Sequence, residues 1–110
     1  MECEEIRVAL RTIPHSADRQ RSAQLLFRLN HTLPFSEEYN ALLRELLGKN
    51  LGEGSTIAPP LSGAALDMLK IGSGVFVNSN LLAMARGGIT IEDNAMIAAN
   101  VQLISNNHDP

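Results

Sequence analysis

The sequence predicts a mainly β fold with N-terminal helices, in which the β part is a parallel β-helix. Three observations lead to this prediction. Apolar residues in the second half recur at every sixth position, small residues, Gly and Asn are frequent there, and the first half has helical spacing instead. Because the composition changes at Gly52, we expect a helical segment over residues 1–51 and a hexapeptide-repeat β-helix over residues 52–110.

Two main helices are predicted in the first half. Over residues 17–30 the apolar residues lie near helical spacing, and Ser16 or Asp18 can serve as the N-cap. The Leu33–Phe35 segment contains a proline and should break the chain. The residues with near-helical spacing are Ala23, Leu26, Phe27 and Leu29–Asn30. Residues 2–12 are expected to form a further, shorter helix.

The second main helix should begin after Ser36, whose side chain can cap the free N–H groups of the first turn. Glu37 and Glu38 follow, and carboxylates suit the positive end of the helix dipole. Gly48 is the expected C-terminal stop. The predicted buried stripe consists of Leu42, Leu43, Leu46 and Leu47.

The six-residue period distinguishes the second half from a plain helix or an alternating strand. It is typical of a parallel β-helix, in which each hexapeptide forms a short strand and a turn and three hexapeptides form a triangular coil. One apolar series consists of Ile71, Val77, Ala83, Ile91, Ile97 and Leu103, and a second of Val75, Leu81, Ala95 and Val101. Both series slip by two residues between Met84 and Ile89, which indicates a turn insertion. The alternative is a sandwich of short strands, which would not keep a fixed six-residue phase.

Several turn residues are expected to be small or to tolerate a positive φ angle. Glycine lacks the Cβ that makes such angles costly, and asparagine adopts them more readily than most residues. The positions assigned to this role are Gly72, Asn78, Asn94 and Asn100.

Composition argues against several classes of function. A net charge of −3 over 110 residues argues against an electrostatic nucleic-acid binder. The single cysteine, Cys3, excludes an internal disulfide framework and a multi-cysteine zinc site. No apolar run approaches the roughly 20 residues that span a bilayer, and the acidic N-terminus is unlike a signal peptide. We therefore expect a soluble, cytoplasmic protein with no metal and no membrane partner.

A family resemblance extends from about residue 20 to the end, with its spacing preserved. It is carried by Leu25–Asn30, Leu43–Gly48, Pro59–Pro60, Ile71–Gly72, Val75–Asn80, Gly87–Ile91 and Ile97–Leu103. In these segments the sequence resembles the maltose/galactoside O-acetyltransferases, which belong to the hexapeptide-repeat acyltransferases. The resemblance implies that the β-helix is left-handed and that the chain forms a homotrimer with active sites between neighbouring subunits.

The chemistry implied by the resemblance is transfer of an acetyl group from acetyl-CoA to a sugar hydroxyl. His108 matches the histidine that acts as general base in the family, and Asn78 matches a polar residue that holds the acceptor or orients the site. An imidazole suits this role because it is largely neutral and adequately basic near neutral pH. The resemblance assigns no residue of this chain to acetyl-CoA binding, and it implies no metal.

The sequence departs from the family over Val8–Ile13, where the enzymes have Tyr and Asp residues near the acceptor, at Glu92, where they have a glycine, and at two further places. Where the enzymes have a carboxylate beside the acceptor, in the turn before Gly87, this sequence has Ala85 and Arg86. The enzymes also continue after the histidine through coils that build the CoA groove and cap the open end, whereas residues 52–110 make only about three coils. We therefore expect a truncated relative with an incomplete C-terminal end. The alternative to a sugar O-acetyltransferase is an inactive β-helical fragment that serves as an oligomerisation or binding module.

Overall fold

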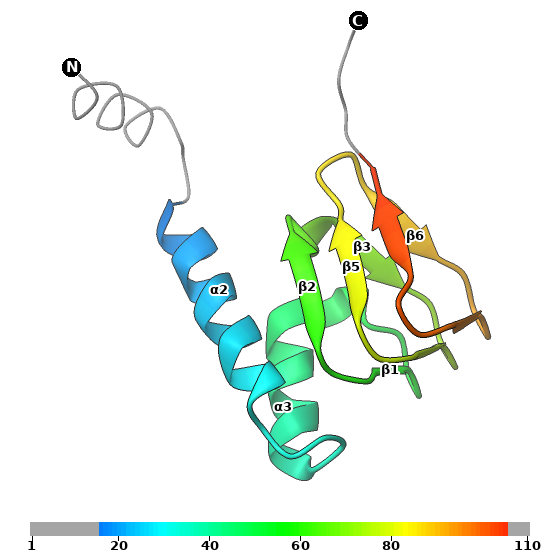
Figure 1. Cartoon of the computed structure of the whole chain (residues 1–110), viewed down its shortest axis with the longest axis horizontal. Helices are drawn as coiled ribbons and strands as arrows, with labels where there is room; N and C mark the ends of the chain where they lie inside the picture. The colour runs from blue at the N-terminus through cyan, green and yellow to red at the C-terminus, as the bar shows by residue number, and fades with distance from the viewer. Residues whose placement is uncertain (1–15, 106–110) are drawn as a thin grey trace, which may run out of the picture.

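The computed structural model describes residues 16–105, in which two helices pack against three small parallel sheets (Figure 1). The helices are α2 (Ser16–Asn30) and α3 (Glu37–Leu47), and two 3-10 turns are η1 (Gly48–Asn50) and η2 (Leu66–Met68). The strands are β1 (Thr56–Ile57), β2 (Leu61–Ala64), β3 (Leu69–Ile71), β4 (Phe76–Val77), β5 (Leu81–Met84), β6 (Ile89–Ile91), β7 (Met96–Ile97) and β8 (Gln102–Ile104). The predicted helix over residues 2–12 lies outside the described residues.

The strands form a stack of coils with a fixed register. Thr56 pairs with Phe76 and Phe76 pairs with Met96, so successive coils are 20 residues apart. The three sheets have the orders β1-β4-β7, β2-β5-β8 and β3-β6, and every strand pair in them is parallel. Each sheet therefore takes one strand from each successive coil, which is the topology of a parallel β-helix. Two facing sheets of a sandwich would not produce this order.

The two-residue slip in the apolar series coincides with a corner of the coil. Met84 ends β5 and Ile89 begins β6, so the extra residues lie in the turn between these strands. The coil before it has a similar insertion between β2 and β3, where Ala65 adopts a φ of 55° and η2 follows. The insertion thus recurs, and a coil contains 20 residues rather than the 18 of three bare hexapeptides.

Asparagines at the turns only partly follow the prediction. Asn94 and Asn100 have φ angles of 63° and 64°, as predicted. The prediction is wrong for Asn78, because the positive φ of that turn, 72°, belongs to Asn80. Asn78 instead accepts a hydrogen bond from the Ser79 N–H at its Oδ1, over 2.7 Å. The Asn78 side chain therefore stabilises the turn through this hydrogen bond, and Asn78 is not among the residues with a positive φ angle.

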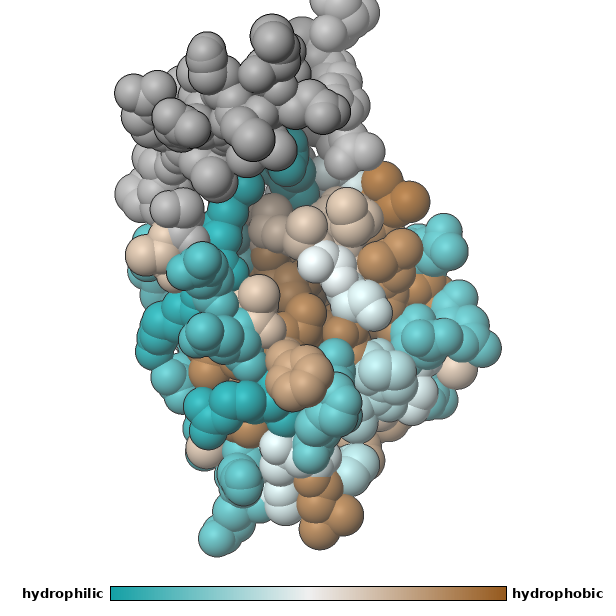
Figure 2. All heavy atoms as spheres, turned by 60° about the vertical axis from the view of Figure 1, so that its left-hand side comes forward, coloured by the Kyte–Doolittle hydropathy of each residue, from teal (hydrophilic) through white to brown (hydrophobic). Residues whose placement is uncertain are grey.

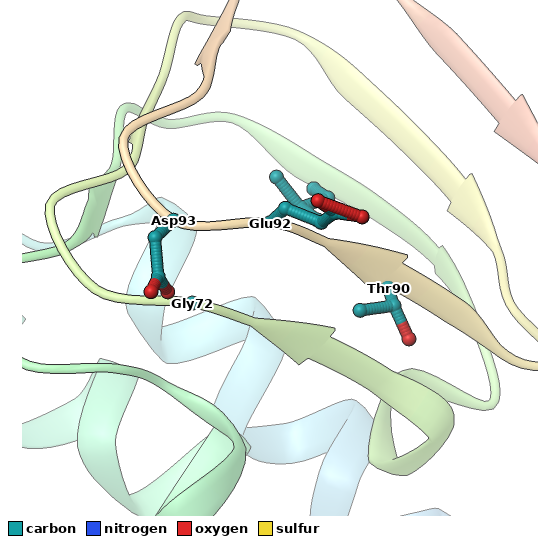
Figure 3. Close-up of a pocket in the computed structure, with 5 residues that line it drawn as sticks. Gly72, Thr90, Glu92 and Asp93 are labelled. Carbon is teal, nitrogen blue, oxygen red and sulfur yellow. The ribbon is translucent and has the colours of Figure 1, made fainter.

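Gly72 is required for a different reason from the one predicted. The positive φ of its turn, 68°, belongs to Gly74. A Cβ on Gly72 would lie 2.2 Å from Asp93 Oδ1 and 2.8 Å from the Asp93 backbone nitrogen. The Asp93 carboxylate points toward this part of the Gly72 turn in Figure 3. Glycine is therefore needed at this position because the next coil approaches closely.

Helix α3 has the predicted ends. The Ser36 hydroxyl accepts a hydrogen bond from the Tyr39 N–H over 3.1 Å, and Gly48 closes the helix with a φ of 58°. The buried face differs in one respect from the predicted stripe, because Leu46 is only partly buried whereas Tyr39 is fully buried. The buried residues of α3 are Tyr39, Leu42, Leu43 and Leu47.

Helix α2 packs against α3 and the first coil through a narrow apolar face. Leu25 and Leu29 are buried, whereas Phe27 is 64% exposed and stacks on the exposed His31 ring. Arg21 of α2 also forms an exposed ion pair with Glu45 of α3, with 2.7 Å between Nη2 and Oε2. None of the helices between residues 16 and 105 is long and apolar enough to cross a membrane.

The helices and the coils share one hydrophobic core. It extends from Leu25 on α2 to Ile91 on β6. Two polar contacts fix the helices on the coils: the Tyr39 hydroxyl donates to the Ile57 carbonyl, and Asn30 hydrogen-bonds the backbone of Leu61. Burial weakens toward the last described coil, where Met96 is 80% exposed.

Candidate functional site

A groove of about 990 Å³ lies between α2 and the corners of the coils. Helix α2 contributes residues between Asp18 and Leu26, the corner after β2 contributes residues 63–68, and the turn after β5 contributes Arg86. In the space-filling view, hydrophilic residues border one side of a hollow whose floor is more apolar (Figure 2). We call this cavity the helix–corner groove.

Small residues keep the helix–corner groove open. Gly63, Ala64 and Ala65 lie on its wall at the end of β2, and all three are only partly buried. A larger residue is excluded at Gly63, where a Cβ would lie 2.0 Å from the Ala83 carbonyl oxygen of the next coil. The close stacking of β2 on β5 therefore also sets the shape of the groove.

Charged side chains surround the groove. Arg21 is neutralised by its ion pair with Glu45. Arg19 and Arg86, in contrast, form no ion pair and no side-chain hydrogen bond in the part of the chain that the structure describes. Two carboxylates, Asp18 and Asp67, line the same groove. The groove therefore offers guanidinium donors and carboxylate acceptors to a polar ligand.

The two predicted site residues are not brought together in the described structure. His108 lies outside the described residues. Asn78 is exposed in the turn after β4, where its backbone N–H donates to the Ile97 carbonyl over 2.8 Å. Asn78 precedes β5 whereas Arg86 follows it, so they lie at opposite ends of this strand. Within one chain, Asn78 therefore lies away from the helix–corner groove.

A second, shallower cleft of about 380 Å³ lies beside β6, lined by Gly72, Thr90, Ile91, Glu92 and Asp93 (Figure 3). Asp93 Oδ1 accepts a hydrogen bond from the Ser73 N–H over 2.8 Å, so this carboxylate stabilises a turn. Nowhere in residues 16–105 do three His, Cys, Asp or Glu side chains come together as potential metal ligands.

Sequence reasoning missed the helix–corner groove. Arg86 attracted notice as a departure from a family pattern, but nothing near it in the sequence indicates that α2 lies opposite. The signal that could have located the groove is the run Gly63–Ala65, because three small residues at the end of a strand leave space beside it.

The chain is similar in sequence to two characterised proteins, although no family model matches it. It is 31% identical over 91 residues to galactoside O-acetyltransferase of Escherichia coli strain K12, a match that covers 82% of this chain and 44% of that protein. It is 34% identical over 101 residues to nodulation protein L of Rhizobium leguminosarum bv. viciae, covering 86% of this chain and 53% of that protein. The chain thus spans about half the length of the curated relatives it matches.

The fold is similar to that of solved acetyltransferases. A hexapeptide-repeat acetyltransferase from Vibrio cholerae superposes with a TM-score of 0.71 and 32% identity, covering 78% of this chain and 48% of that one. A structure of such an enzyme from Vibrio cholerae O1 biovar eltor, in complex with acetyl coenzyme A, gives a TM-score of 0.70 and 29% identity over 82% of this chain and 50% of that one. By sequence and by fold, the chain belongs to the hexapeptide-repeat O-acetyltransferase family.

Proposed function

We propose that the chain takes part in acetyl transfer from acetyl-CoA to a sugar hydroxyl. The observation that supports this most directly is the match of its 20-residue coils to two structures of a hexapeptide-repeat acetyltransferase, one of them in complex with acetyl coenzyme A. A relative in Escherichia coli is a galactoside O-acetyltransferase, which supports a sugar as the acceptor. We further propose a cytoplasmic location, a left-handed coil, and a division between a helical segment over residues 1–51 and coils over residues 52–110.

His108 is the proposed general base. A sugar hydroxyl is a weak nucleophile at neutral pH, so a neutral imidazole would remove its proton while the oxygen attacks the thioester carbonyl of acetyl-CoA. The new C–O ester bond forms as the C–S bond breaks, and the departing CoA thiolate takes up a proton. His108 supplies both proton steps by accepting the first proton and returning it.

Asn78 is the proposed acceptor-positioning residue, and a homotrimer is the proposed assembly. The separation of Asn78 from the helix–corner groove supports this assembly, because a site formed between subunits can combine Asn78 of one chain with the groove of another. An exposed amide side chain can hold a sugar hydroxyl through one donor and one acceptor. The trimer is therefore part of the proposed active site.

The test measures free thiol released from acetyl-CoA in the presence of glucosides, galactosides or maltose. We expect thiol release that depends on the sugar and that falls by two or more orders of magnitude in His108→Ala, since loss of a general base typically costs about 10²–10⁴-fold. His31→Ala is the matched control, because His31 is an exposed histidine directly after α2 whose ring contacts the Phe27 carbonyl and the Phe27 ring. Sedimentation analysis tests the trimer in the same samples.

A second function is favoured by Ala85 and Arg86, which stand where the resemblance implies a carboxylate beside the acceptor. A chain without that carboxylate can keep the coils and lose the transfer reaction. In that case the chain serves as an oligomerisation or binding module. A stable trimer that releases no thiol with any sugar would support the module and contradict the enzyme.

A further inference from the structure

We propose that the helix–corner groove selects a saccharide that carries an anionic group, a carboxylate or a phosphate, and that Arg19 and Arg86 bind this group. The inference rests on the proposed function in one respect only, that the ligand of the groove is a saccharide acceptor. The preference for an anionic group is inferred from the charged residues that line the groove.

The first argument is that two arginines from distant parts of the chain line the same groove. Arg19 lies in the early part of α2, and Arg86 lies in the turn between β5 and β6. Both line the same cavity, and neither has an ion-pair partner in residues 16–105. Arg21, which lines the groove beside them, already has Glu45 as its partner at 2.7 Å. A guanidinium presents a planar fork of donors that matches a carboxylate or a phosphate.

The second argument uses the two carboxylates of the groove. Asp67 of η2 and Asp18 of α2 line it too, and Asp18 already has an interaction of its own. These groups would repel a small inorganic anion, but they are good acceptors for sugar hydroxyls. A neutral sugar would leave Arg19 and Arg86 without a charged partner. A saccharide with an anionic substituent uses both kinds of group, because its hydroxyls face the aspartates and its anion faces the arginines.

The third argument is size. A groove of about 990 Å³ is at the upper end of the roughly 300–1,000 Å³ typical of small-molecule sites. The small side chains of Gly63–Ala65 leave the wall open beside Arg86. The cavity is thus far larger than an inorganic phosphate requires, and it matches a ligand with one or more sugar rings.

The experiment compares glycosides that differ at C6, where they carry either a neutral or an anionic group, by calorimetric titration of the whole chain in low salt and without acetyl-CoA. The ligands are methyl glucoside, methyl glucuronide and methyl glucoside 6-phosphate, with inorganic phosphate as a competitor. We expect the charged glycosides to bind about tenfold or more tightly than the neutral one, as for a hydrogen bond to a charged group. Inorganic phosphate should compete weakly, and added salt should reduce the preference.

Arginine variants locate the binding group. Arg86→Gln and Arg19→Gln should each remove most of the charge preference, and Arg86→Asp should reverse it in favour of the neutral glycoside. Arg44→Gln is the matched control, because Arg44 is an exposed arginine of α3 outside the groove and should leave binding unchanged. Circular dichroism verifies that each variant is folded.

The outcomes separate this inference from the proposed function. Equal binding of neutral and charged glycosides, or binding of neither, overturns the inference. So does a preference that Arg86→Gln and Arg44→Gln reduce equally. Sugar-dependent thiol release from acetyl-CoA with neutral glycosides would still support the acetyl-transfer proposal in those cases. The relative affinities of the glucuronide and the 6-phosphate decide which anion the groove takes.

Discussion

The side chain of Asn30, at the end of α2, forms two hydrogen bonds to the backbone of Leu61, 31 residues further along the chain. Its Nδ2 donates to the Leu61 carbonyl over 2.8 Å, and its Oδ1 accepts from the Leu61 N–H over 2.9 Å. One amide group therefore satisfies both backbone groups of the first residue of β2. This contact fixes the end of the helix against the strand whose far end forms the wall of the helix–corner groove.

Asn30→Ala should destabilise the fold by about 1–3 kcal/mol, because it leaves a partly buried N–H and carbonyl without their partner. Asn30→Asp keeps the acceptor but places a carboxylate oxygen against the Leu61 carbonyl oxygen, so it should destabilise the fold at least as much as Asn30→Ala. Urea unfolding measures these free energies. Equal stability of Asn30→Ala and the wild type would contradict the role assigned to this contact.

Tyr39 should make stability depend on pH in the alkaline range. Burial raises the pKa of its hydroxyl from 10.0 to about 12. As the pH rises, the unfolded chain loses this proton first, so the stabilisation is complete below pH 10 and is lost between pH 10 and about 12. The expected loss is on the order of 2–3 kcal/mol.

Tyr39→Phe removes the titrating group and keeps the ring. We expect this variant to lose about 1 kcal/mol at neutral pH, where its hydrogen bond to Ile57 is missing. Between pH 10 and 12 its stability should fall less steeply than that of the wild type. Parallel curves for the two proteins would show that Tyr39 is not responsible.

Gly52→Ala should destabilise the coils by about 1–3 kcal/mol through overpacking. A Cβ there would lie 2.3 Å from the carbonyl carbon and oxygen of Gly72, which are backbone atoms of the next coil. Glu92→Ala is the matched control, since position 92 follows Ile91 as Gly52 follows Leu51 in the register, yet its side chain is exposed. Thermal or urea unfolding should show an effect within about 0.5 kcal/mol for the control. A large loss in both variants would argue against close approach as the cause.

Ser55 links two coils through its hydroxyl. Its Oγ donates to the Gly72 carbonyl over 2.5 Å and accepts from the Val75 N–H over 2.8 Å. We expect Ser55→Ala to cost about 1–2 kcal/mol in urea unfolding, because both groups are partly buried. Ser62→Ala, at an exposed position of β2, should have little effect. Similar losses of unfolding free energy in the two variants would show that the hydrogen bonds of the Ser55 hydroxyl do not contribute to stability.

Much of the fold could be predicted because the repeat requires it. In each short strand an apolar side chain must point inward. Ile71, Val77 and Ala83 are such residues, so the six-residue period can be recognised in the sequence. The ends of α3 could also be predicted, since the N-terminal cap uses the Ser36 hydroxyl and the positive φ at the C-terminal end favours a glycine, Gly48. The buried side of α2 was harder to predict: Leu25 and Leu26 are adjacent and chemically alike, and only the packing of the helix on the coils decides that Leu25 is buried.

The site could be predicted less well, because its parts are distant in sequence. No local feature of Arg86 indicates that Arg19 lines the same groove, since their proximity depends on how α2 packs on the corners. The hydrogen bonds between Asn30 and Leu61 could not be predicted either. The Asn30 amide bonds backbone groups, which every residue has, so no residue type at position 61 indicates the contact. The roles of Asn78 and His108 stay predictions.

The corner between β2 and β3 has a consequence for how such proteins diversify. Its extra residues, Ala65 and those of η2, lie outside the strand pairs, so lengthening or trimming this loop leaves the strand register of the scaffold unchanged. One residue inserted within β5, in contrast, would turn Leu81 or Ala83 outward. This loop also borders the helix–corner groove. Mutations in the loop can therefore change which ligand the groove binds without changing the strand pairs of the coils.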